Sequence, residues 1–567
     1  MPLKKSQLVG LSLFLISLVI PVTTGSGANP HAITGVVTDQ QKKPLPGVMI
    51  TAFDSTEDKM ITAFTKEGGR FKLPGLTTRD YKLRARLPGF EDEFTNVSYK
   101  ANSSSPVTFR LKPAADLKMQ ATSVERIRLI KWPNNEARLN FRMACAYCHQ
   151  VGTEGFRALK EKAEWEVMVR DVMSTRIGLG AFRSLHKETQ QALPGMLYET
   201  YKRGAEANWP AYMPPPAPSG DALNVVITEW PVGHANHALM HDLEMGDDGL
   251  IYLVDMIHDA VRTLDPKTGE RRSYSIPGGV KDGSGIYPLQ GPHSIEKASN
   301  GDMWITLALG GKMARFDPKT KEFLLIESGE GGKRGGYPHT LRFDQKGICW
   351  YTDAAMNAIF RLDPSTLKIK QYQLLKPEQA SNVPTMGETG GITPYGIDIG
   401  PDGKVWYTKL NGQRVGVIDP ATDKITEWKP PVQGPRRLEV ANDGVVWIPG
   451  FGSGDFCSYD PKKDKWKVYP LPGKGDDIPY AINVDRRTGE IWICGAGSDT
   501  LMRFDPKTEK LTVIPMPTRV TYTRELEFGK DGSIWTCNSN HPARHIEGGR
   551  QSVIKIEIAG KSVVSSP

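Results

Sequence analysis

Residues 400–408 read Gly400-Pro401-Asp402-Gly403-Lys404-Val405-Trp406-Tyr407-Thr408, a tight turn followed by a short strand that contains a tryptophan. The pattern occurs seven times in the 567-residue chain, with its aromatic residue at Tyr252, Trp304, Trp350, Trp406, Trp447, Trp492 and Trp535. A glycine stands three positions before each aromatic, where a hairpin turn needs positive φ. Repeats at intervals of 41 to 56 residues, each with about four short strands, predict a seven-bladed β-propeller over residues 223–562.

The sequence also indicates how the propeller closes. Ile227-Thr228-Glu229-Trp230 repeats the outer strand of the fourth blade, Ile425-Thr426-Glu427-Trp428, but stands before the first blade begins. We expect this segment to complete the last blade beside Val553-Ile554-Lys555-Ile556 and so to remove the exposed sheet edges. A solenoid with open ends is the alternative.

The innermost strand of each blade begins with a large side chain that can form hydrogen bonds. These residues lie eleven positions before the blade aromatic, or twelve in the sixth blade, and are His241, His293, His339, Tyr395, Arg436, Tyr480 and Arg524. Inner strands line the central channel of a propeller, so we expect the seven side chains to converge near one mouth. They are candidate catalytic or ligand-binding residues; the alternative is a polar lining of a wet channel.

The blade sequence, seen in Tyr395-Gly396-Ile397 followed by Gly400–Thr408, resembles the virginiamycin B lyase family of seven-bladed propellers from about residue 223 to residue 560. That family opens a cyclic depsipeptide at its ester by elimination. The resemblance implies a His base, acidic partners and Mg²⁺, and it pairs His339 with Asp353 and His241 with Asp255. Both acids are Asp where the family has Glu, and Tyr480 and Arg524 stand where its own His is expected.

The first 28 residues have the composition of a secretory signal peptide. Lys4 and Lys5 precede an apolar run from Leu8 to Ile20 and a small-residue stretch that ends at Ala28. A membrane anchor is the alternative, but the run is shorter than the roughly 20 residues that a bilayer requires. We expect cleavage after Ala28, a periplasmic or secreted protein, and no membrane span in the mature chain.

Residues 30–113 alternate apolar and polar residues in short runs separated by Gly and Pro, which predicts a β-sandwich. The pieces Gly35–Thr38, Pro44–Val48 and Gly68–Leu76 resemble the carboxypeptidase regulatory-like, transthyretin-like domain. No cluster of residues in this segment suggests catalysis, so we expect a spacer or docking module. Residues 114–134 are expected to be a linker.

Residues 135–210 are predicted to form a small α-helical haem domain. Cys145-Ala146-Tyr147-Cys148-His149 is the attachment signature of c-type haem, in which both thiols bind the porphyrin and the imidazole binds the iron. Thioredoxin-like and zinc CxxC motifs are the alternatives. The order of helices is similar to small bacterial cytochromes c and implies Met173 as the sixth ligand, with Met213 as the alternative. Residues 211–222 form a Pro-rich linker.

The net charge of +8 arises from Lys and Arg interleaved with Asp and Glu, which gives no reason to expect nucleic-acid binding. The remaining thiols, Cys349, Cys457, Cys494 and Cys537, fall on different blades. Cys494 and Cys537 share one repeat position, which indicates small buried packing residues, and a disulfide between some pair is the alternative. The sequence therefore predicts a mainly β, multidomain protein.

Three functions remain open at this point. The first is an exported haem c protein that couples electron transfer, with or without a redox partner protein, to a small molecule bound or oxidised at the propeller. The second is a Mg²⁺-assisted lyase with an accessory haem domain. The third is a propeller that binds an anionic ligand without converting it.

Overall fold

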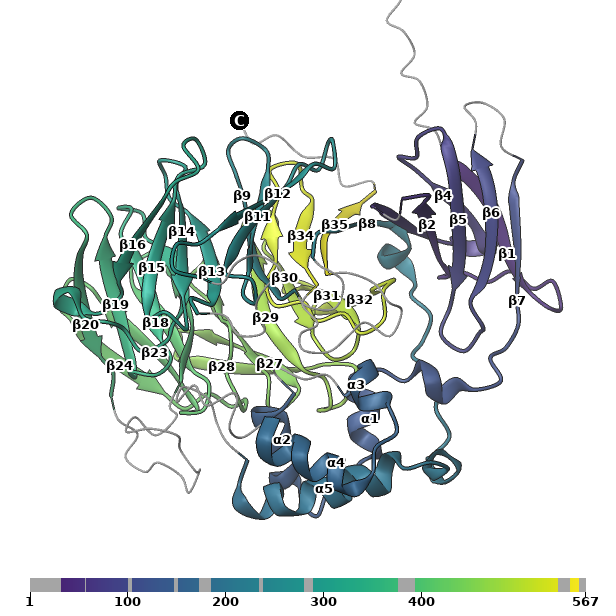
Figure 1. Cartoon of the computed structure of the whole chain (residues 1–567), viewed down its shortest axis with the longest axis horizontal. Helices are drawn as coiled ribbons and strands as arrows, with labels where there is room; N and C mark the ends of the chain where they lie inside the picture. The colour runs from purple at the N-terminus through teal and green to yellow at the C-terminus, as the bar shows by residue number, and fades with distance from the viewer. Residues whose placement is uncertain are drawn as a thin grey trace, which may run out of the picture.

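The computed structural model describes residues 32–56, 58–99, 105–146, 151–172, 185–233, 238–279, 289–375, 393–538 and 551–559. Figure 1 shows a propeller, an N-terminal sandwich at one side of it and a group of helices beneath it. The predicted signal peptide lies outside the described residues. Within the described ranges no helix is long and apolar enough to cross a membrane.

Seven four-stranded antiparallel blades are present among the described residues. The first three are β9 (Met240–Met245), β10 (Ile251–Asp255), β11 (Ala260–Leu264) and β12 (Arg271–Ser275); β13 (Pro292–Lys297), β14 (Met303–Leu307), β15 (Lys312–Phe316) and β16 (Phe323–Glu327); and β17 (Pro338–Phe343), β18 (Cys349–Asp353), β19 (Ala358–Asp363) and β20 (Lys368–Gln373). The next three are β21 (Pro394–Ile399), β22 (Val405–Lys409), β23 (Arg414–Asp419) and β24 (Lys424–Trp428); β25 (Glu439–Val440), β26 (Val446–Gly450), β27 (Asp455–Asp460) and β28 (Lys465–Pro470); and β29 (Pro479–Asp485), β30 (Glu490–Gly495), β31 (Thr500–Asp505) and β32 (Lys510–Pro515). The glycines before the blade aromatics all have positive φ, as the hairpin turns require.

The last blade is closed by the strand that precedes the first. It contains β33 (Glu527–Phe528), β34 (Ile534–Cys537), β35 (Ser552–Ile558) and β8 (Val225–Pro231). Strand β8 pairs antiparallel with β35, with Trp230 opposite Val553 and Ile227 opposite Ile556. The predicted closure is therefore confirmed, and the open solenoid is excluded.

The N-terminal sandwich has two sheets, β4-β1-β7 and β3-β2-β5-β6. Its strands are β1 (Ile33–Asp39), β2 (Met49–Asp54), β3 (Met60–Phe64), β4 (Arg70–Leu73), β5 (Arg79–Arg86), β6 (Glu93–Tyr99) and β7 (Val107–Leu111). Strand β3 pairs with the free side of β8, so the second sheet continues into the last blade and forms one sheet of eight strands. Arg84 and Arg86 also donate hydrogen bonds to the carbonyl oxygen of Pro517. The sandwich is thus docked to the propeller by a shared sheet.

The helical part contains α1 (Ser123–Leu129), α2 (Asn135–Ala144), α3 (Glu154–Arg157), α4 (Lys162–Val167) and α5 (Lys187–Tyr201), and α4 continues as a π-helical turn over Met168–Val172. Helix α1 lies inside the segment 114–134, where we predicted a linker. A capping box between Thr122 and Glu125 starts this helix, and Val124 and Ile127 pack into the same core as α2 and α5. The linker prediction therefore missed a helix that belongs to the domain. Short 3₁₀ turns complete the chain: Glu67–Gly69, Leu117–Gln120, Ala205–Asn208, Gly220–Asn224 and Glu330–Gly332.

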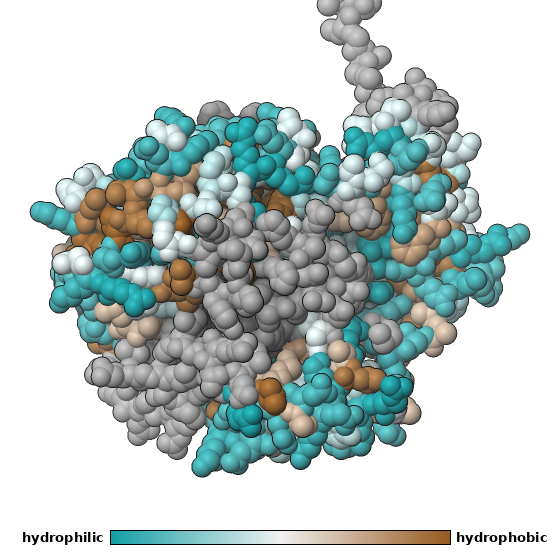
Figure 2. Space-filling model, viewed as in Figure 1, coloured by the Kyte–Doolittle hydropathy of each residue, from teal (hydrophilic) through white to brown (hydrophobic). Residues whose placement is uncertain are grey.

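The four propeller cysteines Cys349, Cys457, Cys494 and Cys537 are buried free thiols, in keeping with the packing role predicted for them. On the face drawn in Figure 2, hydrophilic side chains predominate over the sandwich and the helices, and hydrophobic patches lie on the propeller at the left. The core is divided into clusters between neighbouring blades, a separate sandwich cluster, and a larger cluster that joins the helices to blades six and seven.

Candidate functional site

The seven residues predicted to converge at the channel mouth are brought together and are buried. We call them the mouth ring: His241, His293, His339, Tyr395, Arg436, Tyr480 and Arg524. In five blades the inner strand has a β-bulge at this point, so that two successive residues oppose one residue of the next strand. In the first blade, His241 and Asp242 together oppose Val254. A bulge redirects side chains, and here both residues of the pair are buried at the mouth.

Three histidines of the mouth ring lie side by side, with their rings tilted against one another. The ring centroids of His241 and His293 lie 3.6 Å apart, and those of His293 and His339 lie 4.0 Å apart. Burial is the main cause that holds the pKa of each imidazole well below its usual range, and nearby arginines contribute for all three. The three histidines are therefore neutral at neutral pH. Ligand atoms of His241, Asp242 and His293 lie within 4.8 Å of one another, a spacing that one metal ion can bridge.

Tyrosines and arginines form the other half of the mouth ring. The guanidinium of Arg436 lies 3.5 Å from the ring centroid of Tyr480 and donates a 2.6 Å hydrogen bond to the hydroxyl of Tyr395. Arg524 donates to the hydroxyl of Tyr480 at 3.1 Å. Tyr395 joins the two halves, since its ring centroid lies 3.9 Å from that of His339. One side of the mouth is thus cationic and the other carries neutral bases.

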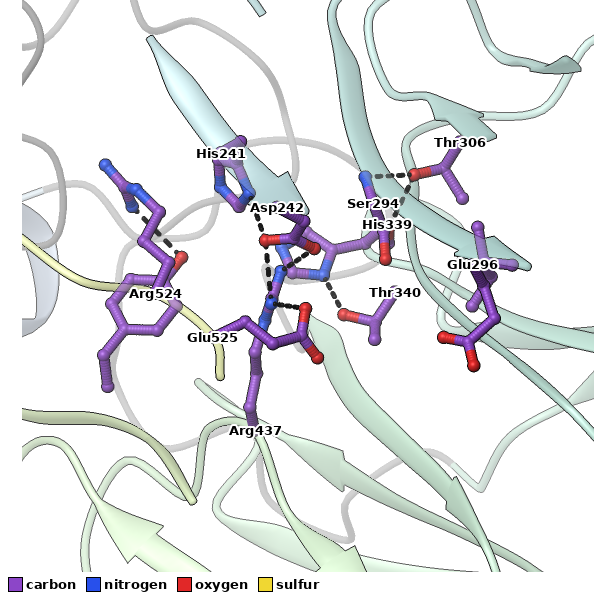
Figure 3. Close-up of polar contacts among 12 residues, drawn as sticks. His241, Asp242, Ser294, Glu296, Thr306, His339, Thr340, Arg437, Arg524 and Glu525 are labelled. Carbon is purple, nitrogen blue, oxygen red and sulfur yellow. Dashed lines mark hydrogen bonds and ion pairs between the residues drawn. The ribbon is translucent and has the colours of Figure 1, made fainter. Parts of the chain in front are cut away.

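A buried ion-pair network supports the ring (Figure 3), and the sequence analysis missed it. Arg437 donates two 2.9 Å hydrogen bonds to the carboxylate of Asp242 and one of 2.6 Å to Glu525. Asp242 also lies 2.9 Å from Nδ1 of His241. All three charged residues stand one position after a member of the mouth ring, and that repeated position was the signal that could have revealed them.

Threonines lock the ring between blades. Thr352 accepts a 3.2 Å hydrogen bond from the backbone N–H of Thr340 in its own blade and donates one of 2.9 Å to the carbonyl oxygen of Tyr395 in the next. Thr306 makes the same pair of bonds with Ser294 and His339. These hydroxyls fix the bulges and so the direction of the mouth-ring side chains.

The two acid partners implied by the family resemblance are placed elsewhere. Asp353 accepts four backbone hydrogen bonds, from Gly336, Tyr337, Ala355 and Met356, and so holds a loop. Nδ1 of His339 instead lies 2.8 Å from the hydroxyl of Thr340.

Asp255 pairs with His258 and Arg262 in its own blade, and not with His241. The pairings His339–Asp353 and His241–Asp255 were therefore wrong. Backbone N–H groups and local cations already satisfy both carboxylates.

A second layer of charged residues lies three positions after the mouth ring. We call it the acidic belt: Glu244, Glu296, Asp398, Glu439 and Glu527. Arg342 and Asn483 occupy the two other blade positions. Burial raises the pKa of Glu296 and of Glu439 to about 8, and neighbouring carboxyl groups add to the effect. Arg342 contacts both Glu296 and Glu525, so it links the belt to the network above it.

The helices meet the propeller beside this mouth. The Tyr522 hydroxyl donates a 3.1 Å hydrogen bond to the carbonyl oxygen of Ala146, and the Tyr522 ring centroid lies 5.6 Å from that of Tyr480. Arg142 is buried and donates to the carbonyl oxygens of Gly475 and Phe451. The first half of the Cys-Ala-Tyr-Cys-His motif thus contacts the mouth ring through Tyr522, and Cys145, Ala146 and Tyr480 belong to one core cluster.

Only some of the predicted haem-binding residues lie within the described ranges. Cys145 is buried in the core cluster of the helices. Cys148, His149 and Met173 lie outside the described residues. Met213 is 80% exposed and is not part of the cluster that contains Cys145, whereas Met168 packs against that cluster.

Sequence comparisons agree with the architecture. The fold and site define a β-propeller fused to a regulatory-type β-sandwich. The Virginiamycin B lyase family profile matches residues 287–536, and the Carboxypeptidase regulatory-like domain profile matches residues 32–112. The chain therefore carries a virginiamycin B lyase-like propeller and a carboxypeptidase regulatory-like domain. Neither match includes the helical segment, so the predicted cytochrome c-like domain gains no support from them.

Individual relatives are distant. The virginiamycin B lyase of Nocardia farcinica (strain IFM 10152) is 27% identical over 159 residues, which are 28% of this chain and 47% of that protein. The chain thus aligns with about half the length of this curated relative. The selenomethionine-substituted virginiamycin B lyase of Staphylococcus aureus is 17% identical with a TM-score of 0.47, over 59% of this chain and 99% of that one. A streptogramin B lyase structure is 19% identical with a TM-score of 0.49, over 60% and 100%.

Proposed function

We propose that the propeller mouth binds a carbonyl compound with an acidic α proton and removes that proton in an elimination, as a lyase. The observation that carries this proposal is the mouth ring itself, in which neutral imidazoles and buried arginines are brought together from the inner strands of different blades. A neutral imidazole is a suitable general base, and a guanidinium stabilises the negative charge that develops on the carbonyl oxygen. The family resemblance of the propeller supports the same class of reaction.

The proposed base is His339. Its Nδ1 lies 2.8 Å from the Thr340 hydroxyl, and in the tautomer in which Nδ1 is the donor the Nε2 lone pair is available. Within the described residues Nε2 has no hydrogen-bond partner. Nε2 takes the α proton, the C–H electron pair forms a carbon–carbon double bond, and the bond from the β carbon to the ester oxygen breaks. The leaving carboxylate keeps that bond's electron pair. Arg436 and Arg524, on the opposite side of the ring, supply positive charge.

The test uses the purified full chain and a cyclic depsipeptide ester, such as the streptogramin quinupristin, which is bound in a structure of a catalytically inactive Staphylococcus aureus lyase. Elimination opens the ring without change of mass, whereas hydrolysis adds one water, so mass spectrometry separates the two. The α proton should also exchange in deuterated water. His339→Gln should lower kcat by about 10²–10⁴-fold, and His186→Gln, in the helical part, should not. Binding without proton exchange would leave only a ligand-binding propeller.

We also propose a second function, that of an exported haem c protein in which electrons pass between the helical domain and the mouth, with or without a redox partner. The contact of Tyr522 with Ala146, between the two motif cysteines, favours it. A c-type haem bound there would supply one-electron chemistry; Tyr522, Tyr480 and Tyr395 would provide aromatic contacts toward His339. Cys145 and Cys148 would attach the group, and His149 and Met173 would bind its iron.

The haem proposal has its own experiment. Expression in a host that matures cytochromes c should give a covalent haem spectrum that Cys145→Ala abolishes. A bound substrate should change the spectrum of the reduced protein under anaerobic conditions. N-terminal sequencing should begin at Asn29 in a periplasmic or secreted product. A colourless protein from such a host would eliminate this function and leave the lyase proposal untouched.

A further inference from the structure

We infer that a divalent transition-metal ion such as Zn²⁺, and not Mg²⁺, binds between His241, Asp242 and His293. These residues come from the inner strands of blades one and two, and their ligand atoms lie within 4.8 Å of one another. All three are buried. Figure 3 shows His241 and Asp242 at neighbouring positions of one strand.

Unsatisfied nitrogens give a second reason. Buried polar atoms are almost always paired, yet Nδ1 of His293 and Nε2 of His339 have no hydrogen-bond partner among the described residues. The His293 and His339 rings each contact a neighbouring imidazole. The face of that neighbouring ring provides no hydrogen-bond partner for the two unpaired nitrogens. A metal ion at this point would satisfy a nitrogen that the protein leaves unpaired.

The ligand set selects the metal. Mg²⁺ prefers carboxylate, carbonyl and water oxygens in an octahedral arrangement, whereas imidazole nitrogen suits zinc and its neighbours in the first transition row. Two imidazoles and one carboxylate make three protein ligands, the number that catalytic zinc sites use when a fourth position stays open. His339 lies beside this ligand set, with its ring centroid 4.0 Å from that of His293.

Arg437 fixes the carboxylate ligand. It holds both oxygens of Asp242 at 2.9 Å and is itself held by Glu525. A carboxylate can bind an ion through one oxygen while an arginine keeps the other, and such outer contacts orient metal ligands. Glu525 is shared between Arg437 and Arg342, so both arginines are paired with carboxylates of the network.

The test measures metal binding alone. Full-length protein made without haem maturation is dialysed against a chelator and titrated with Zn²⁺ by equilibrium dialysis and elemental analysis. His293→Ala should weaken one equivalent by at least about 100-fold, while its neighbour His339→Gln should retain it. Excess Mg²⁺ should not displace the ion. Co²⁺ in the same site should give a visible spectrum without a thiolate charge-transfer band, which separates it from binding at Cys145.

Three results would overturn the inference: no zinc equivalent that depends on His293, equal loss in His339→Gln, or displacement by Mg²⁺. Circular dichroism and His293→Gln, which preserves bulk, guard against a misfolded variant. Any part of the ion in turnover rests on the proposed lyase function, but the binding measurement does not. Zinc binding without α-proton exchange would refute the lyase alone, and proton exchange without zinc binding would refute the metal site alone.

Discussion

The hydroxyl oxygens of Tyr395 and Tyr480 lie 2.8 Å apart, although 85 residues separate them in the chain. The two tyrosines have opposite pKa shifts. Burial raises the pKa of Tyr395, whereas burial of Tyr480 is outweighed by Arg436, Arg524 and Arg437, which leave its pKa below the usual 10.0. In this pair Tyr480 therefore holds its proton less tightly, and Tyr395 is the hydrogen-bond donor once Tyr480 ionises.

The Tyr395–Tyr480 pair predicts that one tyrosine, Tyr480, ionises at a lower pH than the other tyrosines. Ultraviolet absorbance during a pH titration of the native protein should show one tyrosine that ionises below the others, and Tyr480→Phe should remove it. Tyr395→Phe should raise the pKa of Tyr480, because a hydrogen bond to the phenolate is lost. Tyr372→Phe, on the outer strand β20, is the control and should leave the early step unchanged. Retention of that step in Tyr480→Phe would contradict the assignment.

The threonine bridge predicts a stability loss without a change in shape. Thr352→Val is nearly isosteric but leaves the N–H of Thr340 and the carbonyl oxygen of Tyr395 without their partner. Each buried unpaired group costs about 1–3 kcal/mol, so the free energy of unfolding should fall by at least about 2 kcal/mol in denaturant titration. Thr426→Val, half-buried on the outer strand β24, should change it by less than about 0.5 kcal/mol. Equal effects at the two sites would show that the bridge does not stabilise the ring.

The closing strand predicts a strong effect of proline. In β35, Ile554 is paired with Thr536 on one side and Glu229 on the other. Ile554→Pro removes an N–H from this central strand and should cost about 3 kcal/mol or more, which thermal unfolding and size-exclusion chromatography would register as a lower Tm and association through open edges. Lys424→Pro, at the start of the edge strand β24, should be tolerated. A propeller that keeps its Tm with Ile554→Pro would refute closure through β35.

The acidic belt predicts a pH dependence of stability. Burial and the neighbouring Asp398 raise the pKa of Glu439 from 4.5 to about 8 in the folded protein. Its contribution to folding is therefore fully present below the unfolded pKa of 4.5 and is lost as the pH rises through the folded value near 8. In Glu439→Gln, which cannot ionise, the free energy of unfolding should fall less between about pH 5 and about pH 8 than in the unsubstituted protein. Parallel pH curves for the two proteins would disprove the raised pKa.

The propeller was predictable because its signals are local and repeated. The turn glycine, the aromatic and the position of the inner strand recur in every blade, so the register found Tyr480 and Arg524 although neither has a motif of its own. The register also placed Trp230 on the last blade. The signal for the pairing of β8 with β35 was that residues 227–230 repeat the sequence of the outer strand of blade four.

What the sequence did not reveal depends on irregular backbone and on contacts between domains. A β-bulge turns Asp242 into the site, yet alternation along a regular strand places the residue after His241 on the opposite face. The acids Asp255 and Asp353 looked available because backbone N–H partners cannot be read from side-chain spacing. The pairing of β3 with β8 leaves no periodic signature, since it joins two unrelated sheets.

Strand β8 belongs to two ladders at once, with β3 on one side and β35 on the other. The sandwich strands precede β8 in the chain, and the edge strand β3 is the sandwich strand that pairs with β8. Strand β3 can therefore bind β8 before the strands of the six following blades have been synthesised. The last strand of the chain then finds its partner already anchored, and the entropy of closing the disc is reduced. Detaching the sandwich would therefore remove one ladder from the strand on which the whole propeller closes.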